Sequence, residues 1–580
     1  MKRTLQRIKD WIIINKDNII NFILIVCLFG RYWLMRSTNW FVNFDSYYDG
    51  RLQIYNAIKL VTGNWLGDYD KFILCKNLSF PIFVAAICQL HLSYPAGFFG
   101  FICLSSFLFT RSIKPAIKSD FIRKIIFIIV LFNPVGLSFQ AANFYRNAIQ
   151  PWAVLIVISC LIAIYLRKFE KVNFKLFLWP LIGMFFTGFY WNLREDSIWL
   201  LPFILVASII TIVHFIIKTK KIKQSIIFSF IVFMPLIGIV LWNNIISGIN
   251  YKYYGIYATN DRTHTYSSKV LGQLIRIDDG SNSGSNVWVT NESVELAKNA
   301  SPTFAKLNLK VFKLWPTGGD FSIWALRDSA AESGYFKDAK STNEVYKKIY
   351  EELKSAFESG KLKKREGIQL SDTSGIYKTE DLFYNFITSY KLSIRHIKYD
   401  EYRVKELEPI HNAHDEGDFA LYENILGIRL RRTEPQLDEI NSDFTLKLQN
   451  DNVIKSLYHN MFLVNIITNI YNFFSPVFFV FAIIGLFILG IDIFKNKKVD
   501  TCNLEIFIIL IGLLLLCFCS SYLIGIWATS FNLESVNDNI YLSYTTAQTL
   551  IICCFEIIGM VILLKKCLEK YKTKKAHKAL

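Results

Sequence analysis

Residues 44–69 read FDSYYDGRLQIYNAIKLVTGNWLGDY and follow closely on an apolar segment at residues 18–35. The stretch carries two carboxylates, Asp45 and Asp49, which fall on one face if the segment is helical because they are four positions apart. Tyrosine and tryptophan residues surround them. Two interpretations are open: an amphipathic interfacial loop with aromatic anchors, or a catalytic loop at the edge of a membrane. The positions of the other charged residues bear on this choice.

Composition identifies the class of protein. The 580 residues are 52% hydrophobic and 16% aromatic, and the mean hydropathy is +0.30, which predicts an integral membrane protein. A net charge of +18 would suggest nucleic-acid binding in a soluble protein. Here the lysines and arginines stand in short clusters between apolar runs, which is the positive-inside pattern of a membrane protein. We therefore expect membrane lipids, and no nucleic acid, as partners.

The basic clusters, taken as cytoplasmic, give an alternating topology. We predict ten membrane spans, near residues 18–35, 94–111, 122–140, 150–166, 174–191, 198–217, 224–243, 458–492, 504–528 and 541–564. Residues 79–92 are short for a span and contain a proline, so we expect an interfacial or re-entrant helix there. The first span is expected to be retained, because no small-residue cleavage site follows it. Both termini are then cytoplasmic in a multi-pass plasma-membrane protein.

Hydropathy divides the chain into three parts. Residues 1–243 form an N-terminal transmembrane module, whose first external loop is residues 37–93. Residues 244–457 are mixed and charged and contain turn signals, which predicts a folded extracytoplasmic domain of mixed structure. Residues 458–580 form a C-terminal transmembrane module with a basic cytoplasmic tail. The expected fold is therefore an α-helical polytopic membrane protein with a domain inserted before its last three spans.

Most of the unusual ionisable residues gather in the predicted external loops. Asp45, Asp49, Arg51 and Lys76 lie in the first loop, Tyr145 and Arg146 in the second, Arg194, Glu195 and Asp196 in the third, and Asp538 in the last. An ionised side chain at the bilayer centre costs about 2.5–3.5 kcal/mol or more, and the cost is smaller at the interface. Position alone therefore does not establish a function.

Transfer of a group from a lipid-phosphate donor is the chemistry that would use this set. A carboxylate, Asp49 or Asp45, would take the proton from an acceptor hydroxyl. Arg146 and Arg194 suit the departing phosphate, because a guanidinium offers a planar fork of donors. Interfacial ion pairing of the aspartates and anchoring of the loop ends by the arginines are the alternatives.

Glu195 and Asp196 open a predicted span directly after Arg194. Carboxylates there interact favourably with the positive end of a helix dipole. They are also candidates for positioning the acceptor or for holding a divalent cation through oxygen ligands, although their spacing does not define a metal site. His411 and His414 lack a nearby cysteine or an HExxH helix, so we expect a solvated turn. No CxxC pair occurs among the eleven cysteines, so no zinc site is predicted from them. No metal ligands are assigned, and a divalent cation stays open as a cofactor.

Three segments resemble a known family. They are DSYYDGRL at 45–52, the block GNWLGDY at 63–69 with LCKNLSFPIF at 74–83, and LREDSIWLLP at 193–202. In these segments and in layout the chain resembles the bacterial GT-C-type membrane glycosyltransferases, which use polyprenyl-phosphate-linked sugars. The resemblance implies a catalytic base in the first external loop, a donor cavity between spans and loops, inverting transfer, and an external domain that recognises the acceptor. Asp49 is preferred as the base because it directly precedes GRL, but the two aspartates are four apart rather than adjacent, which leaves both open.

The expected function is extracytoplasmic transfer of a sugar from a polyprenyl-phosphate donor to an envelope glycan, lipid or protein. Arg51, Lys76, Tyr145, Arg146, Arg194, Glu195 and Asp196 are the expected substrate-binding residues. A polysaccharide polymerase or ligase is an alternative, separated by its lipid-linked oligosaccharide donor. A lipid-linked-sugar flippase would instead predict polar residues along a path through the spans.

Overall fold

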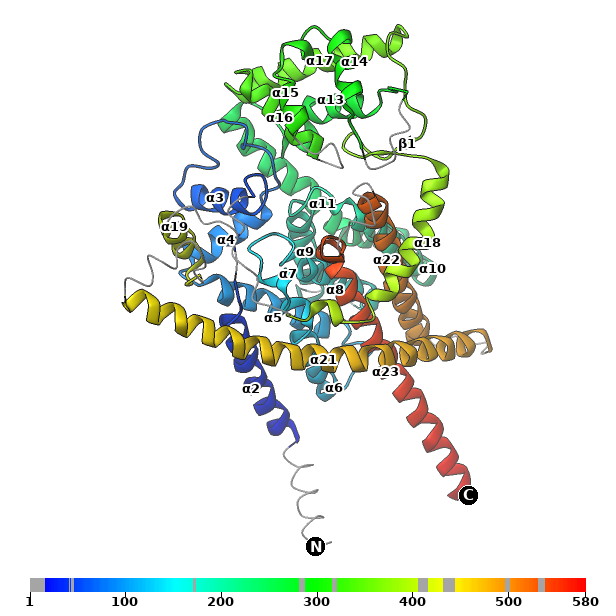
Figure 1. Ribbon diagram of the computed structural model, residues 1–580. Coiled ribbons are helices and arrows are strands. Elements are labelled where there is room, and N and C mark those ends of the chain that lie inside the picture. The colour runs from blue at the N-terminus through cyan, green and yellow to red at the C-terminus, as the bar shows by residue number, and fades with distance from the viewer. Residues whose placement is uncertain are drawn as a thin grey trace.

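A computed structural model of the chain describes residues 16–40, 42, 46–170, 174–280, 287–314, 321–404, 416–430, 444–495, 501–529 and 538–579. Helices dominate these residues (Figure 1). The α-helices are α2 (Lys16–Arg36), α3 (Gly50–Val61), α4 (Ser79–Gln89), α5 (Tyr94–Ser112), α6 (Asp120–Leu131), α7 (Phe139–Ala142), α8 (Gln150–Leu166), α9 (Phe174–Trp191), α10 (Leu201–Thr219), α11 (Ile222–Tyr254), α12 (Asp261–His264), α13 (Tyr266–Ile275), α14 (Asn291–Ala300), α15 (Lys310–Leu314), α16 (Ser322–Glu332), α17 (Ala339–Glu358), α18 (Thr379–Arg395), α19 (Glu416–Leu426), α21 (Phe444–Lys495), α22 (Thr501–Thr529) and α23 (Asp538–Ala579).

Short elements complete the described chain. The 3₁₀ helices are η1 (Pro134–Gly136), η2 (Ser197–Leu200), η3 (Phe304–Lys306) and η5 (Asp400–Tyr402). Strands β1 (Ile368–Gln369) and β2 (Ile376–Tyr377) form an antiparallel pair in which Ile368 faces Tyr377. The fold is thus helical, and within the described residues the region predicted to be mixed contains only this one small sheet.

Six of the described helices are long and apolar enough to cross a membrane. They lie in α2, α10, α11, α21, α22 and α23, and each corresponds to one predicted span. A seventh is counted if α4 and α5, which meet at an angle of 113°, form one broken span. The sharp bend fits the expectation that residues 79–92 form a separate short helix. The protein is therefore a helical membrane protein.

The other three predicted spans coincide with shorter helices. Helix α6 has only 12 residues, about 18 Å at 1.5 Å per residue, against about 30 Å of hydrocarbon. It ends before Pro134 because proline lacks the N–H that a continuing helix needs. Helices α8 and α9 have 17 and 18 residues, near the lower limit for a span.

The core of the membrane part is built around α8. All 17 residues of α8 are buried, as expected for a helix that is apolar on every side. Helices α9 and α11 pack so closely that a Cβ added at Gly238 would collide with the carbonyl of Met184. Small residues allow such close backbone approach between membrane helices.

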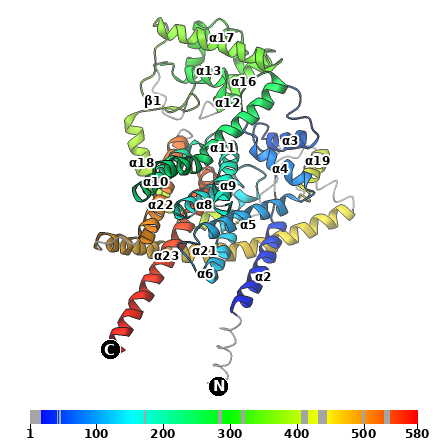
Figure 2. The ribbon, with the colours of Figure 1, turned by 180° about the vertical axis from the view of Figure 1, so that it is seen from behind.

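A compact helical unit, α12 to α17, lies at one end of the molecule. The first residues of α2 and the last residues of α23 lie at the opposite end (Figures 1 and 2). The unit shares its hydrophobic core with the first loop, since Tyr48, Leu52 and Cys75 belong to the same buried cluster as Trp324 and Leu326. The loop and the unit are therefore packed as one body around a common core.

The predicted boundaries of the inserted region at residues 243 and 457 do not match element boundaries. Helix α11 continues past 243 to Tyr254, and α21 runs unbroken from Phe444 through residue 457. Within the same region, α18 packs against α22, and α19 packs against α3 and α4. The compact unit is consequently smaller than predicted, because amphipathic segments after residue 378 associate with the membrane helices. Of the turns predicted at 278–286 and 316–320, the second and the part of the first from residue 281 on lie outside the described residues.

Candidate functional site

Asp49 is the residue immediately before α3, but its side chain does not cap the helix. Ser46 performs that role, since its Oγ accepts hydrogen bonds from the backbone N–H groups of Gly50 at 3.1 Å and Arg51 at 3.4 Å. Asp49 itself makes no side-chain cap bond. Its carboxylate is thus available for contacts with other loops.

Two groups hold one oxygen of the Asp49 carboxylate. Lys76 Nζ lies 2.7 Å from Oδ1, and the Tyr145 hydroxyl donates to the same oxygen at 2.9 Å. The Asp49 side chain is 50% exposed, whereas that of Lys76 is 3% exposed. Partial burial tends to raise the pKa of Asp49, but Lys76, Arg146 and Tyr145 outweigh it and lower the pKa to about 2. Asp49 is therefore an anchored, ionised carboxylate with one oxygen left open.

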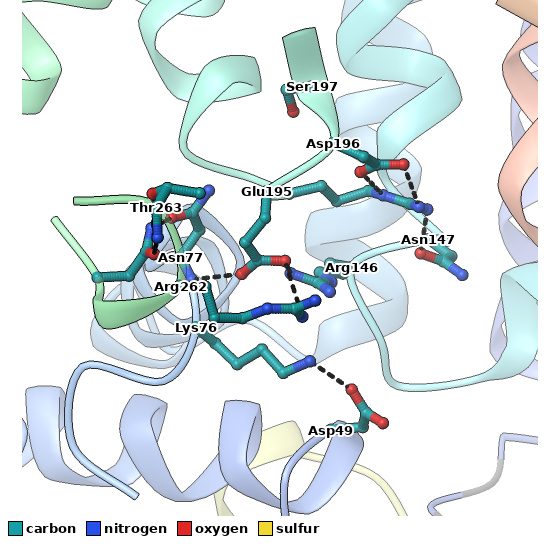
Figure 3. A network of polar contacts seen from close by, with 12 residues as sticks. Asp49, Lys76, Asn77, Arg146, Asn147, Glu195, Asp196, Ser197, Arg262 and Thr263 are labelled. Carbon is teal, nitrogen blue, oxygen red and sulfur yellow. Dashed lines mark hydrogen bonds and ion pairs between the residues drawn. The ribbon is translucent and has the colours of Figure 1, made fainter. Parts of the chain in front are cut away.

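Glu195 lies at the centre of the polar network (Figure 3). Its Oε2 is 2.6 Å from Arg146 Nη1 and 3.9 Å from Arg262 Nη1, and its Oε1 accepts the backbone N–H of Asn77 at 3.0 Å. Burial opposes ionisation, yet Arg146, Lys76 and Arg262 together hold the pKa of Glu195 well below its usual range. Glu195 thus joins three segments that are far apart in the sequence.

Arg194 forms a separate, closed arrangement beside Glu195. Its Nε and Nη2 bind the two oxygens of Asp196, each at 2.7 Å, and its Nη1 donates to Asn147 Oδ1 at 2.6 Å. The guanidinium also lies 4.0 Å from the ring of Tyr544. Because these contacts occupy all three nitrogens, Arg194 orients the third loop and is less suited to bind a ligand directly.

Buried hydrogen bonds, supported by an ion pair inside the helical unit, join the first loop to that unit. Arg327 pairs with Asp261 at 2.7 Å and donates to the carbonyls of Lys71 and Ile73. Asn260 Nδ2 donates to Asn77 Oδ1 at 2.5 Å. These bonds place Arg262 of α12 next to Glu195.

Two cavities flank the network. A cavity of about 450 Å³ is lined by Asp49, aromatic side chains and a Lys71–Asp328 ion pair of 2.8 Å. A second, of about 540 Å³, is lined by Arg194, Glu195, Arg262, His264 and other polar residues. Trp324 lines the first cavity, and its ring has Lys76 at 4.9 Å and Arg262 at 5.2 Å. Asp49 thus lines one cavity and Arg194 and Arg262 line the other, and Trp324 of the first cavity contacts Arg262 of the second.

An apolar groove lies next to the polar network, on the other side of η2. It has a volume of about 480 Å³ and lies between α8, α10 and α22. Ser197 and Ile198 line the polar cavity, and the next residue of η2, Trp199, lines the groove. The indole N–H of Trp199 is buried, and no residue in the described part of the chain accepts a hydrogen bond from it. A polar site and an apolar groove are therefore adjacent across one turn of 3₁₀ helix.

The structure brings together most of the predicted site residues. They are Asp49, Lys76, Tyr145, Arg146, Arg194, Glu195 and Asp196. Arg51 lies outside the network, over the rings of Tyr47 at 4.7 Å and Tyr55 at 5.4 Å. Asp45, His411 and His414 are outside the described residues, as is the side chain of Asp538. Of the two predicted bases, only Asp49 can be placed.

Sequence reasoning missed the contributions of Arg262, Trp324 and Tyr544. Arg262 belongs to NDRTH at 260–264, a charged run shortly after a long apolar segment, and that position was a usable signal. Trp324 and Tyr544 gave no such signal, because their contacts with the cations arise from long-range packing. The predicted recognition domain therefore also supplies part of the polar site.

The carboxylates of the site do not form a set of metal ligands. Glu195 faces Arg146 and Asp196 faces Arg194, so their oxygens are bound by different cations. Within the described parts of the chain, no group of three His, Cys, Asp or Glu side chains converges as a metal site would require. The arrangement of Glu195 and Asp196 does not fit a shared divalent cation.

No protein-family profile matches the chain, and no curated protein sequence and no solved structure shows significant similarity to it.

Proposed function

We propose that the chain is a membrane glycosyltransferase that moves a sugar from a polyprenyl-phosphate donor to a hydroxyl-bearing envelope acceptor. The observation that carries the proposal is the adjacency of three features: the half-exposed carboxylate of Asp49, a cation-lined cavity, and an apolar groove. A lipid-phosphate sugar needs all three, because its tail is apolar, its phosphate is anionic and its transfer requires a base.

The charge balance of the network favours an anionic ligand. Lys76, Arg146, Arg194 and Arg262 oppose Asp49, Glu195 and Asp196, which leaves one positive charge in excess. The Nε of Arg146 is buried and has no hydrogen-bond partner among the described residues, and an unsatisfied buried donor is costly. A phosphodiester carries one negative charge and accepts hydrogen bonds, so it matches this site better than a diphosphate.

The reaction follows from the placement of the groups. Asp49 Oδ2 takes the proton of the acceptor hydroxyl, whose oxygen attacks the anomeric carbon of the donor sugar. The bond between that carbon and the phosphate oxygen breaks, and the electron pair leaves with the lipid phosphate. Arg146 and Arg262 stabilise the phosphate as its charge increases. Attack from the face opposite the phosphate inverts the anomeric centre.

The same proposal includes a topology of ten spans in the plasma membrane. It counts the bent pair α4–α5 and the short helices α6, α8 and α9 with the six long helices, in a GT-C-like arrangement. The beginning of α2 and the end of α23 lie on the side away from α12–α17 (Figure 1), which supports two cytoplasmic termini and an external helical unit.

The test is a transfer assay on the full-length protein in lipid nanodiscs. Synthetic polyprenyl-monophosphate sugars are supplied as a panel, and released polyprenyl phosphate is measured. Wild type and Asp68→Asn should turn over one donor, while Asp49→Asn should not. Asp68 is a matched control because it is an exposed aspartate of the same loop.

Two results would reject parts of the proposal. Full activity of Asp49→Asn would exclude Asp49 as the base. Failure of every monophosphate donor, with processing or movement of lipid-diphosphate glycans, would replace the transferase by a polymerase or a flippase.

A further inference from the structure

Lys76 occupies an unusual position in the site. Its side chain is almost fully buried and its ammonium binds Asp49 Oδ1 at 2.7 Å. The charges of Glu195, Arg146 and Arg262 also act on it. Lys76 therefore interacts both with Asp49, which lines the first cavity, and with Glu195 and Arg262, which line the second.

This position conflicts with the proposed role of Asp49. A carboxylate bound to an ammonium holds protons weakly, and a general base works best when its pKa is near the working pH. The pKa of Asp49 is about 2. In the arrangement seen, Asp49 is a poor proton acceptor, so an additional event has to weaken the Lys76–Asp49 contact before transfer.

Binding of the donor provides such an event. A phosphodiester among Arg146 and Arg262 places a negative charge next to Lys76. Lysine is suited to change partners, because its ammonium is a point charge on a flexible four-carbon stem rather than a fixed fork. Lys76 can therefore turn from one anion to the other without loss of an ionic partner.

Resting on the proposed function, we infer that Lys76 is a positioning residue with two positions. In the empty site it holds Asp49, and with a phosphodiester bound it turns to the phosphate and releases the carboxylate. Donor binding then generates the competent base, so that proton abstraction is confined to the donor-loaded site. No covalent step is added to the reaction.

The inference predicts that binding is coupled to protonation. Release from Lys76, together with the added negative charge, raises the pKa of Asp49. Since a ligand that raises a pKa binds the protonated form better, binding should take up protons and should tighten as the pH falls. The other titratable or charged groups near Asp49 are the neutral Tyr145 and the cation Arg146, together with Lys71 and Asp328, which line the same cavity as Asp49.

Isothermal titration calorimetry can measure the uptake without catalysis. The probe is methyl farnesyl phosphate, a phosphodiester with one constant negative charge between pH 5 and pH 7, added to the full-length protein in nanodiscs. Titrations in buffers of different ionisation enthalpy give the protons taken up per ligand. We expect a fraction of one proton that grows towards pH 5, with a corresponding decrease in Kd.

Variants identify the residue that takes up the proton when the probe binds. Asp49→Asn should abolish the uptake, and Asp68→Asn should retain it. His264 also lines the cation-lined cavity, and burial lowers its pKa, so a bound anion could protonate it instead. Uptake that persists in Asp49→Asn and disappears in His264→Asn would overturn the inference. Lys76→Met should reduce the uptake and weaken binding by about 10- to 100-fold, the effect of a hydrogen bond to a charged group.

The outcomes separate this inference from the proposed function. Binding of the probe without proton uptake would overturn the two positions of Lys76 while leaving the lipid-phosphate donor in place. Failure of the probe to bind at any pH would overturn both, because the cations would then not be a phosphate site.

Discussion

Two clusters of polar side chains are buried in this protein, and the polar groups of each are satisfied in a different way. The network around Glu195 is ionic, has an excess of positive charge, and adjoins two cavities. The second cluster, here called the neutral cluster, consists of Asn133, His396, Tyr399, Tyr402, Ser521 and Thr549. Its members are neutral side chains that form hydrogen bonds with one another between the end of α18 and the helices η1, η5, α22 and α23.

The neutral cluster is closed. Thr549 Oγ1 contacts His396 Nδ1 at 3.1 Å and receives the hydroxyl of Tyr402 at 2.8 Å, and Asn133 donates to the hydroxyl of Tyr399 at 2.9 Å. Neutral groups satisfied in this way cost little when buried and need no ligand. The two clusters therefore differ in two properties, since only the network around Glu195 combines an excess of positive charge with adjoining cavities.

The largest expected effect is a loss of transfer activity, which we predict for a substitution in the ionic network and not for one in the neutral cluster. Asp49→Asn should lower the transfer rate per folded molecule by about 10²- to 10⁴-fold, the usual contribution of a general base. Because it leaves the buried Lys76 ammonium without its ionic partner, it should also lower the melting temperature in detergent. The measurement is steady-state release of polyprenyl phosphate beside a thermal melt. A transfer rate per folded molecule that stays near that of wild type would contradict the role of Asp49 as the base.

The next effect tests how strongly the ionic network depends on pairing. Arg146→Met leaves Glu195 buried without its nearest cation, which should destabilise the protein by about 3–5 kcal/mol. Denaturant titration of Arg146→Met, Glu195→Gln and the double variant gives the coupling between the two residues. Effects of the single variants that simply add would show that the 2.6 Å contact has no energetic role.

A smaller effect is expected in the neutral cluster. Thr549→Val removes a hydroxyl that serves both His396 and Tyr402, which should cost about 1–3 kcal/mol of stability. Transfer per folded molecule should be unchanged, because the cluster does not contact the cavities of the site. Loss of activity at full stability would mean that the neutral cluster takes part in transfer.

The smallest effect is a difference between two pH profiles. With a pKa of about 2 in the free protein, Asp49 is ionised throughout pH 4–7, so kcat/KM should show no loss of this base in that range. If donor binding raises the pKa, kcat should fall towards low pH while kcat/KM stays flat. Identical acid limbs for the two parameters would contradict a donor-dependent pKa.

Local sequence predicted the helices that carry strong signals. The apolar segments at α2, α10, α11, α22 and α23 are long enough to specify spans regardless of their neighbours. Helix α6 was predicted too long, because hydropathy averages over the break that Asn133 and Pro134 introduce. Helix α21 was predicted too short at its start, since its polar first turns extend an apolar helix into a less apolar region.

The ionisable site residues could also be listed from the sequence, but their pairing could not. Asp49, Lys76, Arg146 and Glu195 stood out because charges beside apolar segments are costly. Nothing local indicated that Glu195 would bind the backbone of Asn77 or that Arg262 would approach from α12. Those contacts depend on the shared core of the first loop and the helical unit.

The sequence by itself determined the membrane class, most of the spans, and which residue types are available for chemistry, because these follow from hydropathy and charge along the chain. Only the tertiary structure decided that one oxygen of Asp49 is held by Lys76 while the side chain remains half exposed. It also decided that the cation-lined cavity and the apolar groove meet at η2. Distances between residues remote in sequence are set by packing, and no local pattern encodes them.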